Sequence, residues 1–356
     1  MRIAVFGAGG YTGKLVLAEL NRRDIDTVLV GRDAGRLAEA ASRAGLGTVP
    51  SAAIRQAAAE DHTVLAQAFR DCSAVINCAG PFVLSGEAVV RAALAAGCHY
   101  VDISGEQHHL DRTFAEFAGP AEQAGLTVVP GTNDDGLPSD LLAHVVAERV
   151  APVRELVIGL DVVSGGAMPS RGTLRSGLEN IDSFTTGGLG YEEGRWHADV
   201  AVRCTGLTFP GGAGSTPVAK FPLPAIVTVP RHVKARRVEG VANAQLVVSL
   251  AGLTPAVLDA VPEGPPADSR RNARWIIVVE ATGEDGRHAR GVIHGTDMQG
   301  TTALIAVESA RRLVADGAPA GVLAPSQAYS PADFLRFLGE HGAQWSIDGP
   351  GATVRG

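Results

Sequence analysis

A glycine-rich turn at the start of the chain constrains the fold more than any other feature. The apolar run Arg2–Phe6 leads directly into the segment 7–13, GAGGYTG, and residues 12–22 then follow a helical spacing. A strand, a glycine turn and a helix in this order form the entry unit of a dinucleotide-binding α/β domain. The spacing fits G-x-x-G-x-x-G better than the common G-x-G-x-x-G, through Gly7, Gly10 and Gly13.

The residue types in this turn suit a pyrophosphate group. Gly7 permits the tight turn, while Gly10 and Gly13 let the backbone approach a ligand closely. The first turn of the following helix, at Tyr11 and Thr12, offers unpaired N–H groups and partial positive charge to an anion. We therefore predict that Gly7, Gly10, Tyr11, Thr12 and Gly13 bind the cofactor. The alternative is an ordinary turn between a strand and a helix.

Composition and charge exclude several other classes of protein. The 356 residues carry a net charge of −7 and no long basic patch, so we expect no nucleic-acid partner. No apolar run approaches the roughly 20 residues that span a bilayer, and the chain begins in a strand without a charged and apolar leader. The four cysteines are scattered without C-x-x-C spacing, which predicts neither disulfides nor a zinc site. We expect a cytoplasmic protein.

Strands and helices alternate over residues 1–135, which predicts a Rossmann-type doubly wound parallel sheet. For the third strand, both Thr48–Pro50 and Ile54–Ala58 qualify, and we prefer the second. The predicted strands are Arg2–Phe6, Thr27–Val30, Ile54–Ala58, Ala74–Cys78, Tyr100–Val101 with its flanks, and Leu126–Val129. The predicted helices are Thr12–Arg22, Ala34–Arg43, Val64–Arg70, Gly86–Ala96 and Leu110–Ala124.

The pattern changes after Pro138. Ser139 can cap a helix Asp140–Val150, and runs of strand composition separated by Gly and Pro then follow with few helices between them. These runs are Glu155–Val163, Ala198–Thr205, Ala225–Val229, Ala244–Leu250, Arg274–Ala281 and His288–His294. The Gly- and Pro-rich segments Gly206–Ala219 and Pro262–Asp268 predict surface loops. Further helices are predicted at Thr301–Ala315 and Ser330–Gly339.

These patterns predict an α/β protein whose first domain is discontinuous. Residues 1–137 form an NADP-binding Rossmann domain, and residues 300–356 complete it with helices that pack back on it. Residues 138–299 form an inserted α+β domain built on a mostly antiparallel sheet, which serves substrate binding or oligomerisation.

The end of the second strand indicates which dinucleotide binds. An NAD site places an acidic side chain there to bond the ribose 2′-hydroxyl, whereas this chain has Gly31 and Arg32. Arg32 offers a planar cation to a 2′-phosphate, Gly31 leaves room for it, and Arg36 could add charge. We therefore predict NADP(H) as the cofactor. In the alternative, Arg32 is a solvated residue and Asp33 only caps the next helix.

The fourth strand ends at the crevice that binds ligands in a doubly wound sheet. Asn77 ends this strand, and Ala79, Gly80, Pro81 and Phe82 follow it. Ala79 and Gly80 offer a bare backbone surface, and Pro81 stiffens the turn. We predict that these five residues lie beside the cofactor. The alternative is a loop that only breaks the strand.

The fifth strand ends in a group of polar residues. Asp102, Ser104, Glu106 and His108 could orient the nicotinamide, relay a proton or bind substrate. We predict Asp102 and Ser104 as catalytic residues, and we expect no metal site. In the alternative, Asp102 caps a helix and the neighbouring histidines lie on a solvated helix face.

Two other polar segments could meet a substrate. Asn133, Asp134 and Asp135 follow the sixth strand, and Arg171-Gly172-Thr173 precedes a predicted helix in the second domain. The first could equally be a capped loop, and the second a normal helix start. The sequence has no Gly-x-Ser-x-Gly elbow, kinase lysine set or Tyr-x-x-x-Lys pair. The sequence therefore lacks the motifs typical of hydrolases, kinases and short-chain dehydrogenases.

Taken together, these segments resemble the saccharopine dehydrogenase-like oxidoreductases, and among them most the bacterial trans-acting enoyl reductases. The resemblance rests on the glycine turn 7–13, VGRD at 30–33, NCAGPF at 77–82, HYVDISGE at 99–106 and PSDLL at 138–142. It implies an NADP-binding Rossmann domain with an inserted α+β domain, but it does not imply saccharopine as the substrate. The loop at residues 133–135 departs from the Gly-Phe/Tyr-Asp pattern expected there.

We therefore expect an NADPH-dependent oxidoreductase that transfers hydride to a C=C, C=O or C=N bond of a small or carrier-bound metabolite. Two alternatives stay open. The first is a sensor or scaffold protein that binds NADP(H) without turnover, and the second is an opine- or saccharopine-type amino-acid dehydrogenase. A homodimer through the inserted domain also stays open.

Overall fold

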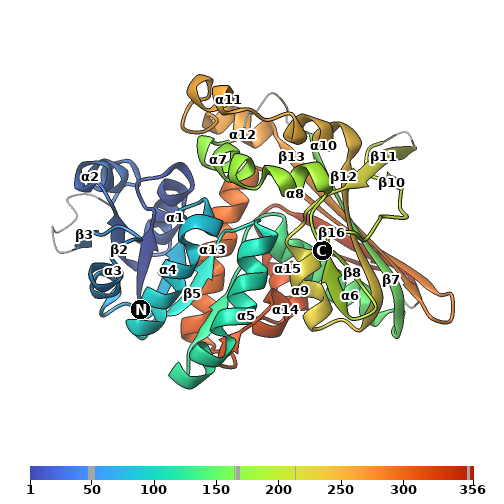
Figure 1. Ribbon diagram of the computed structural model, residues 1–356, viewed down its shortest axis with the longest axis horizontal. Coiled ribbons are helices and arrows are strands. Elements are labelled where there is room, and N and C mark those ends of the chain that lie inside the picture. The colour runs from blue at the N-terminus through green and yellow to red at the C-terminus, as the bar shows by residue number, and fades with distance from the viewer. Residues whose placement is uncertain (47–52, 164, 166–168, 213, 351–352) are drawn as a thin grey trace.

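The structure is a computed structural model that describes residues 1–46, 53–163, 165, 169–212, 214–350 and 353–356. Two β-sheets lie side by side, with helices packed around both (Figure 1). The start of the chain builds the sheet at one end of the molecule, and most of the larger sheet comes from its middle. Within these ranges, no helix combines the length and the apolar character needed to cross a membrane.

The first sheet is parallel throughout, as the sequence predicts. Within the described residues its seven strands have the order β15-β6-β5-β4-β1-β2-β3. The chain runs outward from β1 to β3 and then returns to the other side of β1, which is the doubly wound order with a switch point between β1 and β4. The strands are β1 (Arg2–Phe6), β2 (Asp26–Gly31), β3 (Ile54–Gln56), β4 (Ala74–Asn77), β5 (His99–Asp102), β6 (Thr127–Val129) and β15 (Gly321–Val322).

Helices cover both faces of this sheet because its strands carry apolar side chains on both sides. In β1, Ile3 and Val5 pack toward one helical layer, whereas Ala4 and Phe6 pack toward the other. The first layer contains α1 (Tyr11–Arg22), α2 (Ala34–Arg43) and α13 (Met298–Ala315). The second layer contains α3 (His62–Phe69), α4 (Phe82–Ala95) and α5 (Gln107–Ala124).

The second sheet is mostly antiparallel, which confirms the predicted fold class. Its described strands follow the order β10-β11-β12-β7-β13-β14-β16-β17, with β8 beside β12 and β9 beside β8. Among the described pairs, β12 and β7 run parallel and the others antiparallel. The strands are β7 (Val153–Val163), β8 (Gly190–Glu192), β9 (Arg195–His197), β10 (Gly206–Thr208), β11 (Ser215–Lys220), β12 (Ala235–Asn243), β13 (Arg274–Gly283), β14 (His288–Thr296), β16 (Gln344–Asp348) and β17 (Val354–Arg355).

One face of the second sheet is covered by α6 (Gly136–Glu148). In β7, Leu156 and Ile158 belong to the core on this face, whereas Val157 packs with a small cluster on the opposite face. Two later helices, α14 (Pro325–Ala328) and α15 (Pro331–Glu340), pack on α6. The other helices of this half are α7 (Arg171–Glu179), α8 (Ile181–Thr186), α9 (Ala225–Thr228), η2 (Val229–Arg231), α10 (Ala244–Ala251), α11 (Pro255–Ala260) and α12 (Ala267–Asn272).

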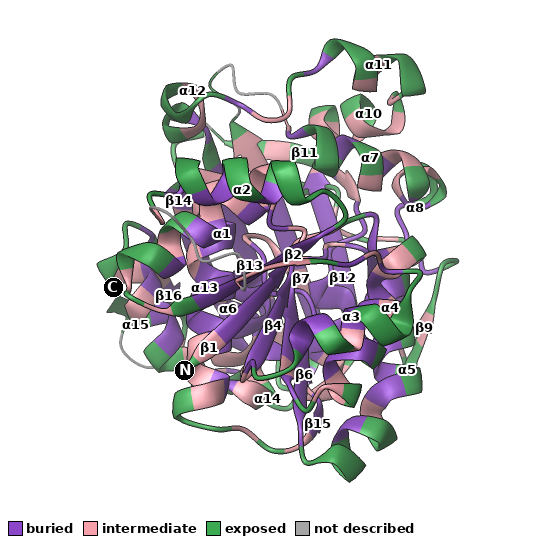
Figure 2. Ribbon diagram, turned by 90° about the vertical axis from the view of Figure 1, so that its left-hand side faces the viewer, coloured by how far each residue is buried: buried purple, intermediate pink, exposed green. Residues whose placement is uncertain are grey.

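A single apolar cluster joins the two halves of the molecule. It includes Ile3 of β1 and Leu17 of α1 together with Leu141 of α6 and Ile277 of β13. The central strands of both sheets are largely buried, while α2 and the outer helices α10 to α12 present mostly exposed or half-buried surfaces (Figure 2). The halves therefore fold against one another around a common core.

Two predicted strands of the second half are wrong because short apolar runs suit helices equally well. Ala225–Val229 forms α9 and the start of η2, and Ala244–Leu250 forms most of α10. The second case has a clear cause. Asn243 ends β12, and its side chain caps α10 by accepting a hydrogen bond from the N–H of Gln245 at 3.0 Å.

The predicted strand Ala198–Thr205 is also wrong. Residues 198–205 are irregular, because the N–H groups of Arg203 and Cys204 donate to the carboxylate of Glu239 rather than to a neighbouring strand. The predicted loop Gly206–Ala219 instead contains β10 and the start of β11, which pair as a hairpin.

Two further predictions concern Ser139 and the third strand of the first sheet. Ser139 does not cap a helix, since α6 begins at Gly136 and Ser139 lies fully buried inside it. Ile54–Gln56 forms β3, while Thr48–Pro50, the other candidate for this strand, lies outside the described residues.

The helix predicted at Thr301–Ala315 packs back on the first domain, as expected. It forms α13, which lies against α1, β4 and β5 and contributes Ala303 and Val307 to the shared core. After α13, β15 extends the first sheet whereas β16 and β17 extend the second. The closing part of the chain thus serves both halves, and the division at residues 137 and 300 remains a proposal.

A buried carboxylate fastens α13 to α1. Glu308 accepts hydrogen bonds from Arg311 and Arg312 of its own helix and from Arg23 at the end of α1, whose Nη1 lies 2.5 Å from Glu308 Oε2. Burial alone would raise the pKa of Glu308, but these three guanidinium groups lower it to about 2. The ionised form of Glu308 therefore stabilises the folded state.

We predict that Glu308→Gln lowers the free energy of unfolding by about 2 kcal/mol at pH 7, because three guanidinium groups lose their shared anion. A group whose pKa is lowered by folding stabilises fully above its unfolded pKa, about 4.3, and loses this contribution as the pH falls toward its folded value. The difference between the proteins should therefore shrink below pH 4. Urea unfolding at pH 7 and pH 3 measures it.

The control for this experiment is Glu39→Gln, which removes an exposed ion pair with Arg43 on α2. We expect this variant to lie within about 0.5 kcal/mol of the natural protein at both pH values. Equal effects of the two substitutions would show that the Glu308 cluster does not join the helices.

Candidate cofactor-binding site

The glycine turn brings the ends of β1, β2 and β4 together. Gly7 has a φ of +80°, which favours glycine, and its N–H donates to the carbonyl of Val30 in β2 at 3.0 Å. A Cβ on Gly7 would lie 2.9 Å from the Cβ of Ala79, so the turns after β1 and β4 are in direct contact. Gly7 therefore makes the tight turn that the sequence predicts.

Gly10 and Gly13 have different surroundings. A Cβ on Gly13 would lie 2.3 Å from the oxygen of Gly7 and 2.9 Å from Cα of Ala8, so glycine is needed for α1 to pack on its own turn. A Cβ on Gly10 would approach the oxygen of Gly7 at 3.2 Å and meet no other atom of the described residues within 4 Å. Gly10 is therefore the open position from which the backbone can approach a ligand.

The N-terminus of α1 has no side-chain cap. Gly10 stands at the cap position, and the N–H groups of the first turn, at Tyr11 and Thr12, have no intrahelical partners. The phenol of Tyr11 turns toward the second half of the chain, where it donates to the oxygen of Pro265 at 2.7 Å and accepts from Arg270 Nη1 at 2.9 Å. The free backbone groups and the helix dipole favour an anion here.

Arg32 follows β2 at the same edge of the sheet. Its carbonyl accepts a hydrogen bond from Gln56, while its side chain is exposed and has no hydrogen-bond or ion-pair partner among the described residues. Asp33 caps α2 by accepting from the N–H of Arg36 at 3.1 Å. The Arg32 guanidinium is therefore available to a phosphate.

Two other cations lie at the glycine turn, and both hold the same carboxylate. Lys14 Nζ lies 2.6 Å from Glu263 Oε2, and Arg36 Nη2 lies 2.8 Å from Glu263 Oε1 and donates to the oxygen of Gly9 at 3.2 Å. Burial opposes ionisation of Glu263, but the Lys14 hydrogen bond and the two positive charges keep its pKa below the ordinary value. A segment of the second half thus reaches the turn of the first.

Asn77 holds the turn that follows β4. Its Oδ1 accepts from the N–H of Ala79 and its Nδ2 donates to the hydroxyl of Tyr100, both at 3.0 Å, and the side chain is fully buried. The structure thus places Asn77 beneath the turn, where it fixes the position of Ala79.

The rest of this turn meets the second half of the chain. The Gly80–Pro81 peptide bond is cis, and a Cβ on Gly80 would lie 2.6 Å from Oγ of Ser176 in α7. Phe82 begins α4, and its ring is buried against His109 with a centroid distance of 5.6 Å. Gly80 therefore permits the close approach of α7.

Asp102 is the centre of a buried hydrogen-bond network. Its Oδ1 accepts from the N–H groups of Ser104 and Gly131 at 3.1 and 2.9 Å, and its Oδ2 lies 3.0 Å from the hydroxyl of Tyr100 and 2.8 Å from Nε2 of His109. The residue has no exposed surface. This geometry supports a positioning role at the ends of β5 and β6, while the predicted catalytic role stays a prediction.

Ser104 is buried in the same way. Its Oγ accepts from the N–H of Glu106 at 3.1 Å, and the Glu106 carboxylate accepts from the N–H groups of Phe82 and Val83 at 2.9 and 2.8 Å. Glu106 therefore caps α4 from outside that helix. His108 lies exposed on α5, as one alternative predicted, whereas its neighbour His109 is buried.

The end of β6 carries two carboxylates without a cation. Asp134 Oδ1 accepts from the hydroxyl of Thr302 at 2.6 Å, while Asp134 Oδ2 and Asp135 Oδ1 are buried without a hydrogen-bond partner among the described residues. Burial and the neighbouring Asp135 raise the pKa of Asp134 to about 7. Burial raises the pKa of Asp135 to about 6. The Oδ1 of Asn133 accepts from the N–H of Gly136 at 2.8 Å at the start of α6, as the alternative of a capped loop predicted, and contact with substrate stays a prediction.

The segment Arg171-Gly172-Thr173 is a normal helix start. Oγ of Ser170 accepts from the N–H of Thr173 at 3.1 Å and so caps α7. The Arg171 guanidinium donates twice to the oxygen of Val261, at 2.7 and 3.1 Å. This cation supports the neighbouring segment of the second half.

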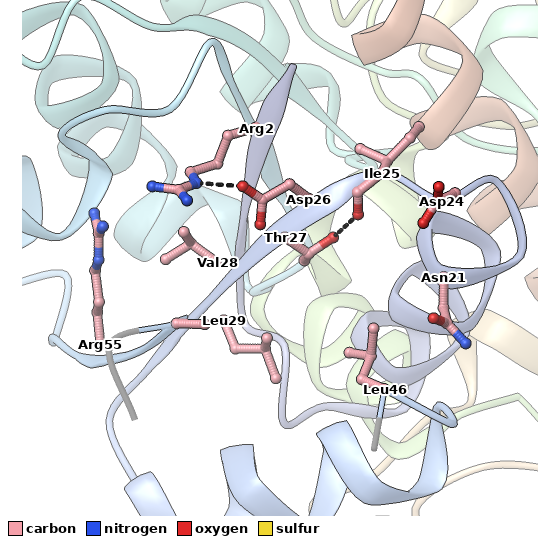
Figure 3. Close-up of a pocket in the computed structure, with 11 residues that line it drawn as sticks. Arg2, Asn21, Asp24, Ile25, Asp26, Thr27, Val28, Leu29, Leu46 and Arg55 are labelled. Atoms are coloured by element: carbon pink, nitrogen blue, oxygen red, sulfur yellow. Dashed lines mark hydrogen bonds and ion pairs between the residues drawn. The ribbon is translucent and has the colours of Figure 1, made fainter. Parts of the chain in front are cut away.

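A cavity lies at the opposite edge of the first sheet from the glycine turn. It has a volume of about 480 Å³ and is lined by Arg2, Asp26, Thr27 and Leu29 near the amino ends of β1 and β2, with Asn21 and Arg55 (Figure 3). Ligands of doubly wound sheets bind at the carboxyl edge, so this cavity does not fit the dinucleotide. Among the described residues, no group of His, Cys, Asp and Glu has a geometry that could hold a metal ion.

Sequence reasoning missed Lys14, Glu263 and Arg270. Lys14 could have been found, because it is the fourth residue of the helix after the glycine turn and its side chain points back toward the turn. Glu263 gives no local signal, since it lies in a Pro- and Gly-rich segment about 250 residues away.

Residues 3–129 match the family described as the saccharopine dehydrogenase NADP-binding domain. The match covers about a third of the chain, the part that forms most of the first sheet. The match confirms NADP as the cofactor of this domain and confirms the resemblance to the saccharopine dehydrogenase-like oxidoreductases.

Curated relatives agree with this family over part of the chain. A Caenorhabditis elegans lipid droplet localized protein is 33% identical over 146 residues, 39% of this chain and 34% of its own length. A human saccharopine dehydrogenase-like oxidoreductase is 24% identical over 216 residues, 56% of this chain and 45% of its own. A Mycobacterium tuberculosis protein whose name proposes trans-acting enoyl reductase activity is 29% identical over 188 residues, 51% of this chain and 44% of its own. The chain thus spans less than half the length of these relatives.

A solved structure shows the same overall fold. The L-glutamate-forming saccharopine dehydrogenase of Saccharomyces cerevisiae, without ligand, has a TM-score of 0.64 with 14% sequence identity, and the match covers 99% of both chains. The NADP-binding domain and the second sheet therefore form one architecture that also occurs in that enzyme.

We predict that Gly10→Ala and Gly13→Ala separate cofactor binding from folding. At Gly10 the added methyl group meets only the oxygen of Gly7 among the described residues, at 3.2 Å, and would take up space expected for the pyrophosphate, so the affinity for NADPH should fall roughly tenfold with little change in Tm. At Gly13 it meets the oxygen of Gly7, so Tm should fall by several degrees. Isothermal titration and thermal melting measure both effects. A Gly10 variant that binds NADPH normally would contradict the assigned phosphate position.

Proposed function

We propose that this protein is an NADPH-dependent oxidoreductase that transfers hydride to a C=C, C=O or C=N bond of a small or carrier-bound metabolite. The observation that carries the proposal is the arrangement at the carboxyl edge of the first sheet. There the uncapped N-terminus of α1, the open position at Gly10 and the unpartnered Arg32 lie within an NADP-binding domain. A bound NADPH supplies the hydride, and the protein must supply position and a proton.

The nicotinamide end of the cofactor would lie over the ends of β4 and β5. In a doubly wound sheet, pyrophosphate at the switch point directs the nicotinamide toward these strands. Phe82, Asp102 and Ser104 lie there, and α7 approaches the same place through the contact of Ser176 with Gly80. We propose that substrate binds between the two halves at this edge and that Asp102 and Ser104 hold the edge in shape.

Reduction of a double bond consumes a proton in addition to the hydride. Asp134 and Asp135 stand at the end of β6, next to β5 in the sheet, and their raised pKa values of about 7 and 6 let the pair hold a proton near neutral pH. We propose this pair as the proton source. In this proposal the loop at residues 133–135 contacts the substrate, which is one of the two roles that the sequence predicts for it.

Partner and location are also proposals. The four cysteines are free, which fits a reducing cytoplasm. The inserted sheet offers a surface for a second copy of the chain. The name of the mycobacterial relative favours enoyl substrates, including carrier-bound ones, as the first to test.

The decisive experiment follows NADPH absorbance with panels of α,β-unsaturated thioesters, ketones and imines. Turnover of any panel supports the proposal and identifies the bond reduced. Turnover of a keto acid only with an amine present would support an opine-type dehydrogenase instead. Tight NADPH binding without turnover of any panel, or of a metabolite extract, would support a sensor or scaffold protein.

We predict that Arg32→Ala weakens NADPH binding far more than NADH binding. A charge-assisted hydrogen bond to the 2′-phosphate contributes about 1.5–3 kcal/mol, and NADH has no such phosphate. Titration of both cofactors should therefore show a loss of about tenfold or more for NADPH only. Arg43→Ala on the far end of α2 is the control. If Arg32→Ala weakens both cofactors equally, the side chain does not read the 2′-phosphate.

A further inference from the structure

Residues 261–266, in the second half of the chain, lie directly on the glycine turn of the first half. Tyr11 donates to the oxygen of Pro265, and a Cβ on Gly264 would lie 2.3 Å from the Tyr11 ring, so ring and backbone are in close contact. The N–H of Arg171 donates to the oxygen of Glu263 at 3.1 Å, which fixes the segment to the start of α7. These contacts of the segment hold the Glu263 side chain beside the glycine turn.

The Glu263 carboxylate forms ion pairs with two cations, Lys14 and Arg36, that could otherwise bind the phosphates of NADP(H). Lys14 belongs to the first turns of α1, whose N-terminus faces the pyrophosphate, and Arg36 belongs to the first turn of α2, next to Arg32. Each of these two side chains forms an ion pair with Glu263, at 2.6 and 2.8 Å. A carboxylate of the protein itself thus binds the cations at a site that is suited to phosphate.

The exposure of these groups makes the carboxylate replaceable. The Glu263 and Arg36 side chains are 38% and 58% exposed, whereas Lys14 is 16% exposed, and an ion pair in water contributes little to the stability of a fold. A phosphate dianion offers more charge and more acceptor oxygens to the Arg36 guanidinium. Exchange of one anion for the other at Arg36 therefore costs the fold little.

We propose that Glu263 is a specificity-determining residue of the cofactor site, whose carboxylate competes with the phosphates of the dinucleotide for Arg36 and Lys14. The inference rests on the proposed binding of NADP(H) at this turn. Because the 2′-phosphate is the group nearest to Arg32 and Arg36, the competition is stronger against NADP(H) than against NAD(H). Glu263 thus lowers the affinity of the protein for NADP(H). It also reduces the ratio by which the protein binds NADP(H) more tightly than NAD(H).

The test compares Glu263→Gln with the natural protein by isothermal titration of NADP⁺ and NAD⁺. The amide keeps the shape and one acceptor for Lys14 but removes the competing charge. We expect NADP⁺ to bind roughly tenfold tighter to the variant and NAD⁺ to gain less than about threefold. The matched control Glu39→Gln, which frees Arg43 on the same helix, should bind both as the natural protein does.

A double-mutant cycle identifies the cation involved. In an Arg36→Ala background, Glu263→Gln should improve NADP⁺ binding by less than half of its effect in the natural protein on a logarithmic scale. Thermal melting of each variant reports whether it folds. If Glu263→Gln melts much lower, Glu263→Asp, which withdraws the carboxylate by one methylene but keeps its charge, should give a smaller gain in NADP⁺ affinity in the same direction.

Unchanged or weaker NADP⁺ binding by folded Glu263→Gln overturns the inference and makes Glu263 a brace between the halves. Equal gains for NADP⁺ and NAD⁺ overturn the assignment of specificity. Failure of the proposed function looks different: the NADP⁺ gain persists while no substrate panel is turned over. No binding of NADP⁺ by any variant overturns both.

Discussion

The carboxyl edge of the first sheet depends on one buried carboxylate. Asp102 holds four hydrogen-bonding groups, two from its own strand and its continuation, one from the start of α5 and one from the end of β6. Without water to satisfy them, each of these groups would be costly to bury unpaired. The network therefore fixes the ends of β4, β5 and β6 relative to one another, through Tyr100 to Asn77 on one side and through Gly131 on the other. Both the predicted cofactor turn and the loop at Asp134 are built on this fixed edge.

The second half of the chain completes that edge from outside. Glu263 reaches the glycine turn, Ser176 reaches Gly80, and Gln107 at the start of α5 bonds the backbone of Leu189 and Leu223. These contacts come from loops and helix starts rather than from the second sheet itself. The sheet provides the rigid platform, with α6 and the shared core behind it, and the loops provide the contacts. The substrate position that we propose between the halves would thus depend on loops, which vary most easily in sequence.

The fold of the first domain could be read from the sequence because its signals are local. The glycine turn, the apolar run of β1 and the cap at Asp33 each lie within a few neighbouring residues. The strand predicted at Ala244–Leu250 is wrong because a short run with five apolar residues fits either period, and only the cap at Asn243 decides between them. Asp102 was correctly singled out as a polar strand end, but burial, which determines its role, comes from partners as distant as Gly131. Glu263 lay beyond any local argument, because the contact with Lys14 exists only after both halves have folded.

The placement of cations explains why the carboxylates of this protein behave so differently. Glu308 is surrounded by three arginines, and the pKa falls to about 2. At the sheet edge, Lys14 and Arg36 lie on the side of the glycine turn and hold Glu263, while Arg270 lies near them and pairs with Asp297. No cation is left for Asp134 and Asp135 among the described residues, and their pKa values rise to about 7 and 6. The edge is therefore divided into a cationic end suited to phosphates and an end that retains protons. A dinucleotide laid across it, with pyrophosphate on α1, would place its reactive ring toward the second end.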